Sequence, residues 1–233
     1  MNKNLVKITA FVAGVITALV ALFYAICGII QLTRFSADGG ARWNVWVAIA
    51  SVLYFAVAAG LGAISYFVIK EYVKKEEGKK HWFLCAAATY FTFVVVFILV
   101  VMIVFNAWDS AMNWVKLVFG VAGLVLAIVA LMGKATGTNG RIFLCVPTIV
   151  GFVLVILGLV NNGGLDLAIG IFLLFMFISY FVYYVFEMVL DGTFKANTNN
   201  TEVKEEAKTE EPKQEEAKPE ITEETKEVET KEE

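Results

Sequence analysis

Ionisable side chains are nearly absent from six long apolar stretches that make up most of the first 190 residues. A charge within the hydrocarbon of a bilayer is costly, so it normally marks an ion path, a proton relay or a substrate site. Glu187 is the one candidate for such a group, and its place ~20 residues into the last stretch puts it at a membrane boundary. We interpret it as a boundary carboxylate, with a cytosolic gate or ligand contact as the alternative.

Histidine occurs once, and there are only three cysteines. His81 has no nearby paired carboxylates or second histidine with which to hold a metal, and a hydrolase needs a nucleophile with a base in reach. Cys27, Cys85 and Cys145 are odd in number and lie in apolar stretches, which argues against a disulfide framework. We therefore predict no catalytic residue, metal site or cofactor, and a protein that is not an enzyme.

The apolar stretches have the length of membrane spans, since a helix needs ~20 residues at ~1.5 Å rise to cross ~30 Å of hydrocarbon. The loops between them are short, which predicts antiparallel neighbours. The sequence predicts an all-α membrane protein whose domain, residues 1–194, has six transmembrane helices arranged as three antiparallel hairpins. The spans are expected at about 8–32, 43–69, 82–105, 114–133, 142–160 and 167–190.

Most lysines and arginines fall on alternate connections, and such residues are retained on the cytoplasmic side. We expect a multi-pass protein of a bacterial-type cytoplasmic membrane, with both termini cytosolic. Tryptophan prefers the membrane boundary and gives a second indication: Trp43, Trp46, Trp108 and Trp114 fall at the predicted outer boundary and Trp82 at the inner one. The outer side then holds only three basic residues, Arg34, Arg42 and Lys116. The cytoplasmic segments hold Lys3, Lys7, Lys70, Lys74, Lys75, Lys79, Lys80, Lys134, Arg141 and Lys195.

The last segment, residues 195–233, differs completely from the rest. It has 7 lysines against 14 glutamates and no aromatic residue, whereas residues 1–194 have 12 basic and 8 acidic side chains. This composition cannot bury enough apolar surface to fold, so we predict a disordered acidic Glu/Lys-rich cytosolic tail. It is either a solvated appendage or a contact for a basic cytosolic protein or for the chain's own lysine-rich loop.

The polar side chains near the middle of the predicted spans are mostly hydroxyl-bearing ones. Such groups bond across helices or back to their own helix, and they could instead line a neutral solute path. We predict either a solute path or a helix-packing polar layer formed by Tyr54, Thr89, Tyr90, Thr92, Ser179 and Tyr180.

Small residues at helical spacing predict close helix contacts, with Gly14, Gly120 and Gly123 among them. Pro147, early in the fifth span, predicts a local bend. The loop between the second and third spans is either a charged helix extension or a site for anionic lipid headgroups, formed by Lys74, Lys75, Lys79 and Lys80.

These observations favour a polytopic membrane protein that is a non-enzymatic accessory, scaffold or sensor component with a cytosolic interaction tail. The alternative is a small channel or transporter for a neutral or weakly polar solute. The lipid bilayer is the expected partner, together with a cytosolic protein at the tail or a second copy of the chain in a homo-oligomer; no nucleic acid is expected.

Overall fold

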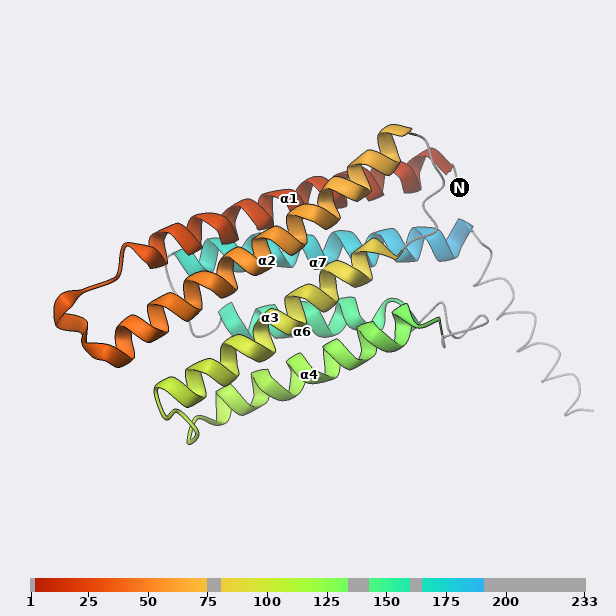
Figure 1. Cartoon of the computed structure of the whole chain (residues 1–233). Coiled ribbons are helices and arrows are strands. Elements are labelled where there is room, and N and C mark those ends of the chain that lie inside the picture. Colours follow the sequence, from red (N-terminus) through yellow and green to blue (C-terminus); the bar gives the residue numbers. More distant parts are fainter. Residues whose placement is uncertain (1–2, 75–80, 134–142, 160–164, 191–233) are drawn as a thin grey trace, which may run out of the picture. The chain divides into compact units, whose positions relative to one another are not determined.

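The computed structural model describes residues 3–74, 81–133, 143–159 and 165–190. Over these ranges all regular structure is helical and no strand occurs, which confirms the all-α prediction (Figure 1). The elements are α1 (Lys3–Leu32), the short 3-10 helix η1 (Ala37–Gly39), α2 (Gly40–Lys74), α3 (Trp82–Val104), α4 (Ala111–Leu131), α6 (Val146–Leu159) and α7 (Leu165–Leu190).

Five segments in the described part of the chain are long and apolar enough to cross a membrane: Asn4–Leu32, Ala37–Tyr72, Trp82–Val104, Ala111–Leu131 and Leu167–Leu190. The second extends beyond the predicted 43–69 at both ends. The sixth helix, α6, has 14 residues, or ~21 Å, which is shorter than the ~30 Å of hydrocarbon.

The fifth predicted span, at about 142–160, is described from residue 143 to residue 159, and within this part α6 begins at Val146. Pro147 occupies the first turn of α6, where no backbone N–H is needed. The Cys145 carbonyl accepts bonds from the Thr148 hydroxyl, at 2.6 Å, and from the Ile149 amide, at 3.1 Å. Pro147 therefore lies in the first turn of α6, directly after a turn at Leu144 and Cys145.

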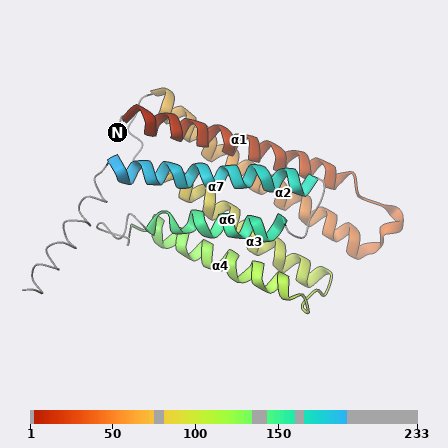
Figure 2. The same ribbon diagram turned by 180° about the vertical axis from the view of Figure 1, so that it is seen from behind.

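The six α-helices of the described part form a closed ring of neighbours. In the order α1, α2, α3, α4, α6, α7, each helix packs against the next, and α7 packs back against α1 (Figures 1 and 2). A further contact joins α3 to α6 across the ring. The first and last of the described helices are thus direct neighbours.

Large apolar side chains cover the outside of this ring. Val52, Ile103 and Val118 are each more than three-fifths exposed, whereas Tyr180, Phe91 and Phe177 are almost completely buried. A water-soluble protein rarely exposes so much contiguous apolar surface. The outer surface therefore fits lipid, as expected of a membrane-embedded protein.

Close helix contacts occur at small residues, as the sequence predicted. Gly14 on α1 faces Val68 on α2, and the Ser65 hydroxyl donates to the Gly14 carbonyl at 2.7 Å. On α4, Gly120 faces Val95 and Gly123 lies directly against the ring of Phe91. These glycines let the helix backbones approach closely.

The two ends of the bundle are marked by tryptophans. At one, here called the Trp114 end, the indole of Trp43 donates to the Arg34 carbonyl at 3.0 Å and that of Trp114 to the Trp108 carbonyl at 2.8 Å. At the other, the Trp82 end, the Trp82 indole donates to Glu71 at 2.8 Å.

Candidate functional site

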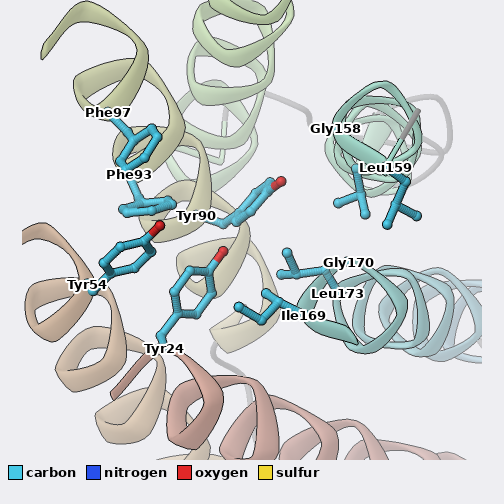
Figure 3. A pocket seen from close by; sticks show the side chains of 11 residues that line it. Tyr24, Tyr54, Tyr90, Phe93, Phe97, Gly158, Leu159, Ile169, Gly170 and Leu173 are labelled. Carbon is cyan, nitrogen blue, oxygen red and sulfur yellow. The ribbon is translucent and has the colours of Figure 1, made fainter. Parts of the chain in front are cut away.

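A cavity of about 200 Å³ lies between α1, α2 and α3 on one side and α6 and α7 on the other (Figure 3). It is nearer the Trp114 end, because α6 contributes its last residues and α7 its first turns. The lining residues are Tyr24, Tyr54, Tyr90, Phe93, Phe97, Val155, Gly158, Leu159, Ile169, Gly170 and Leu173.

One wall of this tyrosine cavity is aromatic. The ring of Phe93 on α3 lies 5.2 Å from that of Tyr24 and 5.7 Å from that of Tyr54. Phe97 extends the group, with its ring 5.8 Å from Tyr54. Figure 3 shows these rings gathered on the α1–α3 side. Packed rings from three helices make this wall rigid.

Tyr90 supplies a polar group to the same space. Its side chain is buried, its ring lies 5.3 Å from Phe177, and it reaches into the cavity from α3 (Figure 3). No hydrogen bond joins its hydroxyl to the described part of the chain. A phenol that can donate and accept is therefore available to a bound molecule.

The opposite wall is aliphatic and partly open. A Cβ atom added to Gly158 would meet no atom of the described residues within 4 Å, whereas one added to Gly170 would collide with Leu159. The space in front of Gly158 therefore belongs to the cavity, while Gly170 is needed for the contact between α6 and α7.

The bundle is tightly packed between the cavity and the Trp82 end. The Thr17 hydroxyl donates to the Ala13 carbonyl, so the bond of 2.6 Å between Thr17 and Tyr180 has the Tyr180 hydroxyl as donor. The Tyr180 ring also packs at a tilt against that of Phe83, with ring centres 4.7 Å apart, and Leu61 and Leu84 are completely buried. The cavity is therefore closed on this side.

The predicted hydroxyl layer is divided between different places. Tyr54 and Tyr90 line the cavity, and Tyr180 lies in the packed region. The other three hydroxyls bond to carbonyls of their own helices: Thr89 to Cys85, the exposed Thr92 to Ala88, and Ser179 to Met176. The structure does not gather the six residues at one site.

Tyr24 is the cavity residue that sequence reasoning missed. The predicted layer was restricted to the middle of each span, and Tyr24 lies in the second half of α1. Because α1 packs against α2, the aromatic ring of Tyr24 nevertheless lies 6.0 Å from that of Tyr54. A search for tyrosines one to two turns from the span centres would have included it.

Glu187 is partly buried in the last turn of α7, near the Trp82 end and far along the helix from the cavity. Its carboxylate is close enough to Tyr184 and Cys145 to interact with both electrostatically. The buried Tyr184 hydroxyl lies beside the backbone of Leu84, whose amide already donates to the His81 carbonyl. Among the residues that the structure describes, this hydroxyl has no hydrogen-bond partner. The gate role of Glu187 stays a prediction.

Several predicted sites lie outside the described residues. They include Lys75, Lys79 and Lys80 and the tail at 195–233; the Lys74 side chain is also outside. Within the described ranges, no group of three or more His, Cys, Asp or Glu side chains is placed to hold a metal ion.

In comparisons with known proteins, no family model, curated protein or solved structure matches the chain.

Proposed function

We propose that the chain is a non-enzymatic membrane component that binds a small neutral or weakly polar molecule in the tyrosine cavity, as a sensor or accessory subunit. The convergence of Tyr24, Tyr54 and Tyr90 from three helices on one cavity is the observation that carries this proposal. A largely apolar pocket with a few placed polar groups is the usual form of a small-molecule site.

The size and chemistry of the cavity define the ligand class. An apolar cavity of about 150 Å³ holds benzene, so one of about 200 Å³ has room for a small aromatic or short aliphatic body. None of the described residues that line it carries a charge, which disfavours an ion. Phenol hydroxyls favour a ligand with one or two hydrogen-bonding groups, such as an alcohol or a phenol.

A channel or transporter for the same solute is the second candidate. The cavity supports it because a binding site within a bundle also serves transport. The packing around Thr17, Tyr180 and Phe83 favours the sensor, because it closes the Trp82 side in this structure. Transport would require that packing to open.

Binding is tested with the purified full chain in lipid nanodiscs, by ligand-observed NMR with phenol, benzyl alcohol, indole and glycerol as probes. We expect at least one aromatic probe to bind. Gly158→Leu fills the open space and should lower its affinity at least about tenfold. Tyr90→Phe removes one hydrogen bond and should lower it about two- to tenfold. Thr92→Ala, on the exposed face, is the matched control.

Two results would contradict the proposal: no probe binds, or Gly158→Leu binds as tightly as the natural chain. Flux separates the two candidates. Glycerol crosses pure lipid slowly, so proteoliposomes that equilibrate glycerol faster than empty liposomes would favour the transporter. A bound probe without flux favours the sensor.

We also propose six spans in three antiparallel hairpins, with both termini in the cytosol. The five long helices and the alternation of basic residues support this arrangement. A total of six spans requires residues 142–160 to form the fifth span in the chain, and this range is longer than the described helix α6. The acidic tail is proposed to contact a cytosolic protein, and Lys74, Lys75, Lys79 and Lys80 to contact anionic lipid. A homo-oligomer stays a prediction.

Thiol labelling tests the orientation. Cys27 and Cys145 are buried and Cys85 is partly buried, so a Cys85→Ala background should react little. In intact cells, a membrane-impermeant maleimide should label Asp38→Cys, at the exposed first loop, but not Thr201→Cys in the tail until the cells are opened. External labelling of Thr201→Cys would overturn the orientation.

Pull-downs with and without residues 195–233 test the tail contact. The two sets of captured proteins should differ by a cytosolic partner, and identical sets would contradict the proposed contact.

A further inference from the structure

A groove of about 450 Å³ lies at the Trp114 end, between the first turns of α2 and the end of α3. It is separate from the tyrosine cavity and shares no residue with it. Its walls are polar at two positions and apolar at the rest: Ala41, Arg42, Val45, Ile103, Val104 and Asn106. The groove is thus amphipathic.

Both polar residues have hydrogen-bond donors without an acceptor in the described part of the chain. Arg42 is exposed and forms no ion pair or hydrogen bond with the described part of the chain. Asn106 is also exposed, with no partner for its amide in the same part, and its backbone is held at a φ of 52° in the turn after α3. A guanidinium and an amide N–H₂ group therefore face one groove without a protein acceptor.

The apolar residues continue the groove along the surface of the bundle. Val45 is 51% exposed and Ile103 is 65% exposed. Beside them, Trp46 packs against Phe105 with ring centres 5.4 Å apart, and tryptophan favours the headgroup level. An acyl chain that covered Val45 and Ile103 would thus start at the level of Arg42.

The local charges favour an anion only because of the arginine. The amino end of α2, at Gly40, is partially positive, and the carboxyl end of α3, at Val104, is partially negative. The partial charges of these two helix ends offset one another. The Arg42 guanidinium therefore makes the groove positive, and its planar group of N–H donors suits two oxygens of a phosphate.

We propose that this groove binds the phosphate headgroup of a membrane phospholipid and selects lipids with net negative charge. Arg42 holds the phosphate, Asn106 donates a further bond, and Val45 and Ile103 pack against the acyl chain. This site is at the opposite end of the bundle from the lysine loop, and it does not depend on the tyrosine cavity or on a bound solute.

The test uses the full chain reconstituted in phosphatidylcholine vesicles. Quenching of tryptophan fluorescence by brominated phosphatidylglycerol is compared with quenching by brominated phosphatidylcholine, which gives a relative affinity; Trp43 and Trp46 lie near the groove. We expect phosphatidylglycerol to bind more tightly. Arg42→Gln should reduce this preference about fivefold, the effect of one basic residue at the membrane surface.

Arg34→Gln is the matched control, because Arg34 lies at the same end but its guanidinium bonds to Gln31 at 3.3 Å. It should leave the preference unchanged. Asn106→Gly removes the amide while tolerating the positive φ, and should reduce the preference by a smaller factor than Arg42→Gln. The proposal is overturned if the natural chain shows no preference, if Arg42→Gln keeps it, or if Arg34→Gln lowers it equally.

Discussion

Replacing Tyr180 by alanine is expected to lower the free energy of unfolding by about 3–5 kcal/mol, the usual cost of truncating a large aromatic side chain in a packed core. The Tyr180 side chain is completely buried between α1, α3 and α7. Its removal leaves a space that the neighbouring rings of Phe83 and Phe177 cannot fill, so contacts are lost on three helices.

Tyr180→Phe separates the ring from its hydroxyl. It keeps the packing and loses only the bond to Thr17, so it should cost about 0.6 kcal/mol and no more than about 1.7 kcal/mol. Unfolding is followed by SDS titration in mixed micelles, with the buried thiols of Cys27 and Cys145 as reporters that react with a dye on exposure. Equal losses for both variants would show that the ring does not fill the core as described.

Gly123→Ala is expected to destabilise the protein by about 1–3 kcal/mol, the usual cost of overpacking. The added methyl group would collide with the ring of Phe91, which is fully buried and faces Phe177 at 6.2 Å. The ring has no free space to move into, so α4 would have to shift away from α3. The same SDS titration measures the change.

Gly62→Ala is the matched control for this substitution. Its added Cβ atom would lie 4.0 Å from Ala21, an ordinary contact, and alanine favours the helix over glycine by about 0.5–1 kcal/mol. Gly62→Ala should therefore leave the stability unchanged or raise it slightly. Phe91→Leu should partly rescue Gly123→Ala; absence of both the loss and the rescue would contradict the close approach of α3 and α4.

Helix positions were largely predictable, because apolar length and the residues that end a span are local properties. The first helix ends at Leu32, as predicted, before the polar run that begins at Thr33. The start of α6 was not predicted, since the same Pro147 is compatible with a kinked long helix and with a short helix that begins there. The residues before it decide between these, and they are not distinctive.

The candidate site was only partly predictable, because rotation about the helix axis decides which hydroxyl faces a partner. Tyr90 and Thr92 are two residues apart, so they point to different sides; one lines the cavity and the other is exposed. The sequence indicates that hydroxyls are present in a span. It does not indicate that α1, α2 and α3 would bring Tyr24, Tyr54 and Tyr90 together.

The contact between α1 and α7 has a consequence for the biogenesis of the protein. Of the described helices, α1 leaves the ribosome first and α7 last, so the Thr17 face of α1 has no permanent neighbour until α7 has been made. Earlier helices can enter the bilayer in sequence, but the ring closes only when Tyr180 arrives. A chain that stops before α7 would leave the faces of α1 and α6 that contact α7 exposed, and we expect cellular quality control to recognise it as incompletely folded.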